Sequence, residues 1–414
     1  MPRPWGRDWD WRANLYLPFG DRVRSLGSDS SASLSGASIQ VTTTTREERA
    51  LAGFDAELGW RTPLFDRDDP RQLRLYFGGY RFSDDKVMVA GPRVRAELAL
   101  EELPSLWKGA RLFFSAEAQY DSVRGSQQFL GLRLRIPLDK ASRHGQLSAQ
   151  ARRMTAPVVR DVDIVTQSRV ASTLVETASQ LANGTAVTVI SSATTTGAAL
   201  PGAVAAAGAN STVILSGSFN TTASVILQTG QTLMGAGTLS VTTPSGRSAS
   251  LTTPTATVSA TGAADAAIRL ANNSVLRGMT ISSGGAGVSP FGSISGATIA
   301  NNTITAGGVA LTLRDSNNIT VTGNSLSANS AGIAIALDVQ TDFGGTYSAV
   351  VNNNTLSAAG ATSVAIRLGG EGAGPGPLAV SGSGNVRAAG ACIVPFGTTI
   401  TGSIGFTDGS TCPP

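Results

Sequence analysis

The side chains most able to do chemistry in this 414-residue chain are a few carboxylates in residues 166–414. Polysaccharide hydrolases need two carboxylates placed for acid and base work, and calcium-dependent lyases need several clustered carboxylates. Only Asp338 and Asp342 lie close together, and we expect a polar loop there rather than a catalytic pair. Asp315, next to Arg314, is typical of a surface ion pair. The remaining charged candidates are scattered: Asp265, Glu371, Asp408, Arg247, Arg269, Arg277 and Arg367.

Other kinds of site find little support. His144 is the only histidine, so the sequence holds no Ser/His/Asp triad and no histidine metal site. The glycine-rich stretch 369–372 lacks the lysine and the helix of a phosphate-binding loop. The arginines of residues 1–165 alternate with acids at the period of a strand, which is not typical of a nucleic-acid patch. We therefore predict no catalytic residue, no metal, no cofactor and no nucleic-acid partner.

Cys392 and Cys412 are the only cysteines. Their spacing excludes a CxxC redox or zinc motif, and their proximity in an otherwise cysteine-free chain favours one disulfide in an oxidising compartment. Two free thiols are the alternative. A bond here would close a loop of roughly 20 residues and contribute about 3 kcal/mol.

Charge is distributed unevenly along the chain. Residues 1–165 hold 25 of the 32 Lys and Arg residues and 21 of the 28 Asp and Glu residues. Residues 166–414 hold 7 of each class and no lysine, so the net charge of +4 belongs to the first part. The second part is mostly Ala, Gly, Ser, Thr, Val and Asn, and its short runs of Val, Ile and Leu favour ordered β structure over disorder. The change marks a domain boundary.

Residues 1–140 alternate between apolar and polar side chains with a period of two. Six segments of roughly 8–11 residues show the alternation, as a tilted membrane strand requires. Ala37–Thr43 is a weaker seventh candidate. The six segments are Trp9–Phe19, Phe54–Leu64, Arg71–Gly79, Arg93–Glu101, Arg111–Asp121 and Phe129–Leu138.

This pattern favours an antiparallel transmembrane barrel with apolar residues facing lipid and charged residues facing the lumen. A soluble sheet with one wet face is the alternative, although it usually carries fewer charges per strand. No run of about 18 apolar residues predicts a transmembrane helix. The residues that we expect to face the lumen are Arg12, Asp55, Glu57, Arg61, Arg74, Arg93, Arg95, Glu97, Glu117, Arg133 and Arg135.

Several stretches occur in an order that resembles the C-terminal half of the inverse autotransporter β-domain, the barrel of intimin and invasin. Glu48–Asp55 leads into one strand, Leu73–Tyr80 forms another, and Phe129–Asp139 is the closing strand. A short helical linker and the segment Val159–Val165 follow. The resemblance covers about residues 9–165.

The resemblance implies a bacterial outer-membrane protein whose barrel contacts outer-membrane lipid, is inserted by the barrel assembly machinery and carries an extracellular passenger. It also implies a linker helix through the barrel, and the polar, proline-free segment Ala141–Met154 fits that role. Family barrels have twelve strands after a signal peptide. This sequence shows about six or seven strands and no apolar segment after Met1, so we expect a fragment with further strands and an export signal upstream.

From about Ile190 onwards, short apolar triplets alternate with glycine and asparagine. The successive intervals between Asn273, Asn302, Asn324 and Asn354 are 29, 22 and 30 residues. An irregular repeat of this length with three short strands per turn is typical of a solenoid. We predict that the triplets stack into a narrow core. The asparagines should occupy left-handed turns and bond their neighbours in the stack rather than carry sugars.

Both ends of the predicted solenoid have candidate caps. The alanine-rich segment 198–207 is expected to form a short helix over the first coil, and the two cysteines are expected to staple the last coil. Segment Gln231–Gly237 resembles the early coils of pectate-lyase-like right-handed β-helices, a fold that includes lyases and hydrolases.

The sequence therefore predicts an all-β protein in three parts. These are a partial transmembrane antiparallel β-barrel (1–140), a linker helix with a connector (141–189) and a right-handed parallel β-helix (190–414). We expect the barrel to anchor and export an adhesive or structural passenger that binds a host or environmental glycan or protein. A surface-displayed polysaccharide lyase or hydrolase is the alternative, and a wholly soluble β protein is the third hypothesis.

Overall fold

The computed structural model describes residues 8–66, 69–101, 110–136, 165–262, 266–370, 376–395, 397 and 399–413. These residues divide into two compact units. The first holds residues up to Ser28 together with Thr44–Ser172, and the second holds Asp29–Thr43 together with residues from Thr173 onwards. The predicted linker helix at Ala141–Met154 lies outside the described residues.

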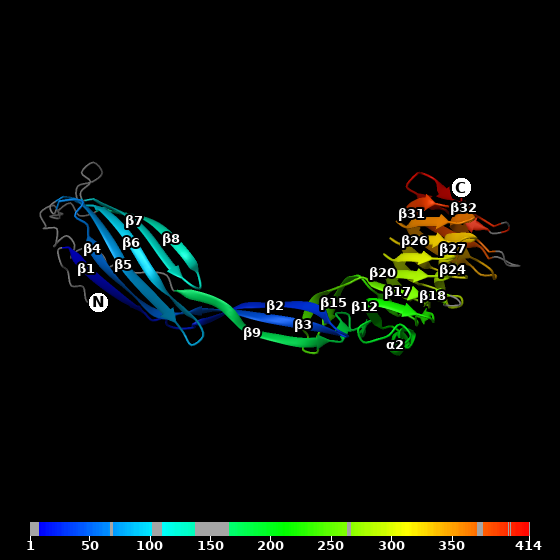
Figure 1. Cartoon of the computed structure of the whole chain (residues 1–414), viewed down its shortest axis with the longest axis horizontal. Helices are drawn as coiled ribbons and strands as arrows, with labels where there is room; N and C mark the ends of the chain where they lie inside the picture. The colour runs from blue at the N-terminus through cyan, green and yellow to red at the C-terminus, as the bar shows by residue number, and fades with distance from the viewer. Residues whose placement is uncertain are drawn as a thin grey trace. The chain divides into compact units, whose positions relative to one another are not determined.

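The first unit is built on a six-stranded antiparallel sheet with the order β1-β4-β5-β6-β7-β8 (Figure 1). All six alternating segments of the sequence form its strands, and the pairing runs without a register shift. Among the described strands, β1 and β8 are its edges. The strands are β1 (Trp9–Tyr16), β4 (Ala52–Arg61), β5 (Arg71–Ser83), β6 (Met88–Leu100), β7 (Arg111–Asp121) and β8 (Gly125–Arg135).

The seventh membrane strand predicted at Ala37–Thr43 is wrong. That segment lies in β3 (Ser38–Ala50), which belongs to a separate three-stranded sheet with β2 (Val23–Ser35) and β9 (Thr166–Ala178). The polar segment Arg22–Leu34 is largely strand, since it coincides with β2. Strands β2, β3 and β9 each include residues of both units.

The physical reason is where the apolar residues of β3 are buried. Ile39 and Val41 are each 1% exposed and belong to an apolar cluster of the second unit with Met234, Val241 and Leu251. Their alternation thus reflects packing against protein. Beside them lies a small antiparallel sheet, made of β10 (Gln180–Leu181), β15 (Gly237–Thr242) and β16 (Ser248–Thr253).

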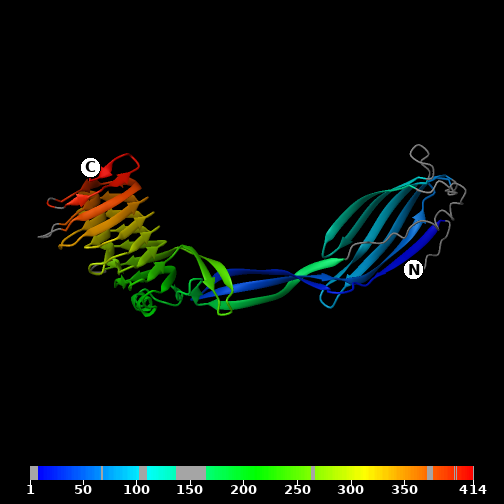
Figure 2. The same ribbon diagram turned by 180° about the vertical axis from the view of Figure 1, so that it is seen from behind.

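The second unit is a parallel β-helix in which three stacks of short strands pair coil to coil (Figures 1 and 2). Strands β12 and β31 each run through both the first and the second stack. The first stack contains β11 (Val187–Ser191), β12 (Thr212–Thr221), β14 (Thr232–Met234), β19 (Val275–Arg277), β22 (Thr298–Ala300), β25 (Ile319–Thr322), β28 (Tyr347–Asn352), β31 (Leu378–Ala389) and β33 (Ile400–Thr401).

The other two stacks complete each coil. The second contains β17 (Ala256–Ala260), β20 (Met279–Ser283), β23 (Thr303–Ala306), β26 (Ser325–Asn329) and β29 (Thr355–Ala359), followed by the terminal β34 (Ile404–Phe406) and β35 (Thr411–Cys412). The third contains β13 (Val225–Ile226), β18 (Ala266–Leu270), β21 (Ala286–Pro290), β24 (Val309–Arg314), β27 (Ile333–Gln340), β30 (Thr362–Leu368) and β32 (Ala391–Ile393).

The predicted narrow core is confirmed. The central residue of each apolar triplet points inward and stacks on its counterpart in the next coil, as Val258, Ile281, Ile304, Leu326 and Leu356 do in the second stack. All five are at most 1% exposed. Each coil therefore buries apolar area mainly against its two neighbours, which makes stability local along the solenoid.

The predicted left-handed asparagine turns are confirmed in part, because asparagines adopt positive φ in several turns but Asn302, Asn324 and Asn354 do not. Between the first and second stacks, the residue with positive φ alternates between glycine and asparagine: Gly278, Asn301, Gly323, Asn353 and Gly384. A Cβ atom at Gly323 would lie 2.4 Å from Oδ1 of Asn301, and one at Gly384 would lie 2.2 Å from Oδ1 of Asn353. Each of these asparagine side chains thus lies against the turn of the next coil. Only glycine, which has no Cβ atom, fits at that turn.

A second asparagine follows in these turns, points inward and forms a continuous ladder. Asn302, Asn324, Asn354 and Asn385 are at most 2% exposed. The backbone N–H and the Nδ2 amide of Asn302 both donate to Oδ1 of Asn324, at 2.9 Å and 3.0 Å. The same pair of bonds joins Asn324 to Asn354 and Asn354 to Asn385. Each Nδ2 also donates to a buried carbonyl of the first stack, so the ladder ties consecutive coils together.

The expected N-terminal cap is present as α2 (Leu200–Ala206). Leu200 and Val204 of this helix are fully buried over the first coils. Gln231, in the segment that resembles pectate-lyase coils, is itself fully buried and donates from Nε2 to the carbonyls of Val204 and Gly208, each at 3.0 Å. The helix is therefore held by both apolar packing and a buried hydrogen-bond donor.

We expect Asn324→Ala to weaken the middle of the solenoid. The change leaves the buried N–H and amide of Asn302 without their acceptor, and an unsatisfied buried polar group costs about 1–3 kcal/mol. Hydrogen exchange should accelerate in β22 to β29 first. Asn329→Ala is the control and should change little, because Asn329 is exposed at the end of β26, the strand that follows Asn324. Equal effects of the two variants would contradict a stabilising role for the ladder.

Candidate functional site

One face of the six-stranded sheet carries charged side chains on each of its strands. The register places every residue predicted to face a lumen on this one face, including Arg61, Arg133 and Arg135. Most are shielded from solvent, with Asp55, Arg74 and Arg93 between 2% and 8% exposed. Arg133 on the edge strand β8 keeps a side chain that is 44% exposed.

Glu57 lies at the centre of this face and is 4% exposed. Its carboxylate contacts the guanidinium of Arg12, and it lies 3.6 Å from Arg93 and 3.4 Å from Arg95. Glu97, on the same strand as Arg95, lies 3.1 Å from it and extends the network along β6. Ion pairing over several strands thus compensates charges that would otherwise be costly to bury.

The network continues outward from this centre. Glu117 pairs with Arg93 at 3.0 Å, Arg133 lies 3.6 Å from Glu97, and Arg74 lies 3.8 Å from Asp10.

A tyrosine ring and a glycine lie among these long side chains. The ring stacks against guanidinium groups, and the glycine leaves space for the central carboxylate. Arg95 stacks over the ring of Tyr76 at 4.1 Å and Arg12 at 5.4 Å, in the geometry of cation–π contacts. Gly78 pairs with Glu57 in the register, and a Cβ atom there would lie 2.7 Å from Cγ of Glu57. A larger residue at this position would displace the central carboxylate.

A second polar cluster at one end of the face was not predicted as a unit. Tyr80 donates its hydroxyl to Asp121 at 2.7 Å, and Arg124 in the β7–β8 turn donates to the same carboxylate at 2.9 Å. The signal was present, because the alternation of β5 continues past Gly79 to Tyr80 and Phe82. The predicted strand ended too early to include them.

The opposite face of the sheet is apolar and exposed. Leu15 is 68% exposed, Leu130 is 90% exposed and Leu132 is 68% exposed. Phe54, Leu58, Phe77, Val94 and Phe114 continue the surface across the sheet, each between 45% and 53% exposed. The sheet is thus inverted relative to a water-soluble protein, since its charges are inside and its apolar side chains are outside.

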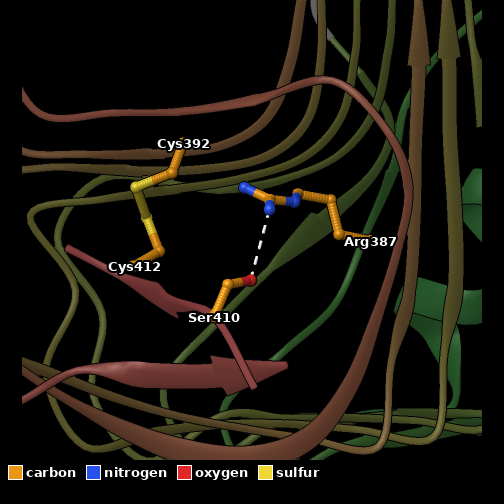
Figure 3. Close-up of a disulfide and its surroundings, with 4 residues drawn as sticks. All are labelled: Arg387, Cys392, Ser410 and Cys412. Atoms are coloured by element: carbon orange, nitrogen blue, oxygen red, sulfur yellow. Dashed lines mark hydrogen bonds between the residues drawn. A yellow bond between two sulfur atoms is a disulfide. The ribbon is translucent and has the colours of Figure 1, made fainter. Parts of the chain in front are cut away.

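The C-terminal end of the β-helix is closed by the predicted disulfide between Cys392 and Cys412 (Figure 3). Cys412 is fully buried in the solenoid core. Beside the bond, Arg387 donates to Ser410 at 3.2 Å (Figure 3). Arg387 also stacks over Phe406 at 5.1 Å. Hydrogen bonds from Ser410 lower the pKa of the Asp408 carboxyl. The last coil is therefore held by covalent, apolar and polar contacts.

Asp338 and Asp342 are held by different arginines, and Asp338 lies in β27 rather than in the polar loop expected there. Arg367 donates to both oxygens of Asp338, at 2.8 Å and 2.6 Å, and Asp338 is 1% exposed. Burial raises the pKa of the Asp338 carboxyl, and the Arg367 guanidinium acts in the opposite direction. Arg314 lies 3.0 Å from Asp342.

The ion pair expected between Arg314 and Asp315 is wrong. Asp315 instead adopts a positive φ, and its carboxylate accepts the backbone N–H groups of Asp342 and Phe343 at 2.8 Å and 3.3 Å. Asp265, Glu371 and His144 lie outside the described residues.

The described residues show neither a metal-ligand cluster nor a helix that could span a membrane. No group of three or more His, Cys, Asp or Glu side chains is placed to hold a metal ion. No described helix is long and apolar enough to cross a bilayer.

Comparison with known proteins concerns the second unit. Residues 249–382 match the family model described as the right-handed β-helix region. The match begins in β16 of the small antiparallel sheet, spans the coils from β17 to the first part of β31 and agrees with the resemblance noted at Gln231–Gly237. No curated protein matches the chain significantly. The right-handed β-helix is therefore shown for this part of the chain, whereas the resemblance of the first part to inverse autotransporter barrels rests on the sequence pattern.

We expect Glu57→Gln to destabilise the six-stranded sheet strongly. The change leaves three guanidinium groups around a neutral side chain, and removing one partner of a buried ion pair costs about 3–5 kcal/mol. Samples would be incubated at increasing temperatures and run on gels without boiling. The folded band should disappear at a lower temperature for the variant than for the unsubstituted protein. Asp69→Asn is the control. Its partner Arg71 is exposed at the start of β5, and such surface ion pairs contribute little to stability. A similar fall in both variants would argue against a central role for Glu57.

We expect replacement of both Cys392 and Cys412 by serine to loosen the last one or two coils only. The bond restricts the unfolded ensemble by closing a loop, and its loss should remove about 3 kcal/mol of local stability. Hydrogen exchange should rise from β31 onwards while coils before Asn354 stay protected. Uniform loss of protection along the β-helix, or two freely alkylated thiols in the native protein, would overturn this expectation.

Proposed function

We propose that this chain is an outer-membrane surface protein of the inverse autotransporter type. In this proposal the six-stranded sheet is part of a membrane-spanning barrel inserted by the barrel assembly machinery. The β-helix is the passenger that the barrel exports and displays outside the cell. The disulfide agrees with this placement, because such bonds persist in oxidising compartments.

The observation that carries the proposal is the inverted burial of the six-stranded sheet. Soluble monomers rarely expose a contiguous apolar surface as wide as the one that includes Phe54, Phe114 and Leu130. Lipid-facing strands place apolar residues outward along their whole length and polar residues inward. The Glu57 network supports the same orientation, because a lumen accommodates paired charges that a lipid surface would not.

The lengths and edges of the strands set a further requirement. The strands contain 8 to 13 residues, and about 9–11 tilted residues cross a bilayer. In lipid, unpaired backbone groups cost several kcal/mol each, so the outer edges of β1 and β8 would need strand partners to close the barrel.

We further propose that the passenger is adhesive or structural rather than enzymatic. Its carboxylates at Asp338 and Asp342 are each engaged by an arginine, which leaves neither free to act as the acid or base of a hydrolase. The stacked coils form a rigid scaffold suited to presenting a binding surface to a glycan, a protein or a solid. The direct test is whether cells that display the protein adhere to such targets better than cells that display it without residues 190–414.

We expect Leu132→Arg to disfavour membrane assembly by about 2–4 kcal/mol if residue 132 lies near the middle of the bilayer. Leu132 pairs with Phe114 on the exposed apolar face. Ser115→Arg is the matched control, because Ser115 pairs with Gly131 at the same height on the charged face, beside Glu97. The folded fraction in the outer membrane should fall for Leu132→Arg and stay near the unsubstituted level for Ser115→Arg. Equal losses, or no loss from either, would remove the case for a lipid-facing surface.

A further inference from the structure

The outer face of the second stack carries two straight columns of hydroxyl side chains that the functions above do not use. Residue-by-residue pairing aligns six coils, from β12 to β29. We call this surface the hydroxyl array. Its first column is Ser218, Thr257, Thr280, Thr303, Ser325 and Thr355, and its second is Asn220, Ser259, Ser282, Thr305, Ser327 and Ser357.

The array is accessible and uncharged. Thr303, Thr305, Ser325 and Thr355 are exposed, while the residues between the two columns point into the core. Strands β17, β20, β23, β26 and β29 contain no charged and no aromatic residue. Eleven of the twelve positions are serine or threonine, so the surface offers hydroxyl groups, methyl groups and little else.

The array is also regular. Its five successive strand pairings have no register shift, and the first shift in this stack comes at the pairing of β29 with β31. Neighbouring strands lie about 4.8 Å apart, and residues two apart on one strand lie about 6.7 Å apart. The hydroxyl groups therefore form a two-dimensional grid with these two spacings.

The buried asparagine ladder holds the grid in place. Asn302, Asn324 and Asn354 directly precede Thr303, Ser325 and Thr355, so the ladder fixes the start of the array strands β23, β26 and β29. Threonine side chains are stiff at χ1, which limits the orientations of their hydroxyl and methyl groups. A ligand would meet a preorganised surface and lose little affinity to ordering it.

These properties favour a neutral, solid ligand with its own repeating lattice. A charged partner would be recognised through complementary charge, which the array lacks. Soluble small ligands are usually held in concave sites with aromatic walls and converging polar groups, and the array offers neither. Crystalline water presents a planar lattice of hydrogen-bond donors and acceptors at comparable spacings, with hollows that accept methyl groups.

We propose that the hydroxyl array binds the surface of ice. The inference rests on the proposed adhesive role, because it names the solid that the passenger would hold. It does not depend on membrane insertion, so membrane fractionation and ice binding can fail independently.

The test measures how the full chain, kept soluble in detergent, partitions into slowly growing ice. The unsubstituted protein should be enriched in the ice fraction relative to the liquid. Thr303→Lys, at the centre of the array, should reduce enrichment to that of a non-binding protein, because a hydrated lysine prevents close approach. Thr320→Lys is the matched control, since Thr320 points outward from β25 in the first stack of the next coil, and it should retain enrichment.

Thr305→Lys provides a second array variant, and protease resistance shows that each variant is folded. Exclusion of the unsubstituted protein from ice, or equal losses in Thr303→Lys and Thr320→Lys, would overturn the proposal. Binding to insoluble cellulose or chitin that Thr303→Lys abolishes, without enrichment in ice, would also overturn it and assign the array to neutral polysaccharide.

Discussion

The hydrogen-bond ladder from Asn302 to Asn385 is the constraint on which the β-helix depends. Each of its amides is buried between coils, where an unsatisfied polar group is costly, so each coil must place its asparagine against the next. That requirement fixes the turn, the strand that follows it and the register of the second stack. The apolar core, the left-handed turns and the outward columns of hydroxyl groups all follow from coils held in one register.

In the six-stranded sheet, most of the polar groups that are shielded from water are charged, and those around Glu57 form ion pairs. Arginine and glutamate side chains around Glu57 are shielded from water and compensate one another over several strands. The apolar side chains point the other way and remain exposed. Buried polar groups that satisfy one another thus hold both units, with amides in the β-helix and ion pairs in the sheet. The exposed apolar face is the reason that we propose lipid as the surroundings of the sheet.

Much of this could be predicted from the sequence, because period-two alternation and asparagine spacing are local signals. The six strands, the single charged face, the stacked core, the cap at Leu200–Ala206 and the disulfide were all expected. The hairpin of β2 and β3 was not, because Ile39 and Val41 alternate like lipid-facing residues, and only tertiary contacts show that they pack against protein. The partners of Asp315 and Asp342 depend on which coils become neighbours, which spacing alone does not reveal.

Whether the apolar face of β8 contacts lipid can be measured directly. Single cysteines at residues 128 to 134, each carrying a spin label in the membrane-inserted protein with the native disulfide intact, would report local surroundings residue by residue. If the apolar face contacts lipid, accessibility to oxygen, which concentrates in lipid, should peak at Leu130, Leu132 and Leu134. Accessibility to a water-soluble nickel complex should peak at the residues between them. High nickel accessibility at Leu130 and Leu132, or no alternation along the strand, would contradict a lipid-facing sheet.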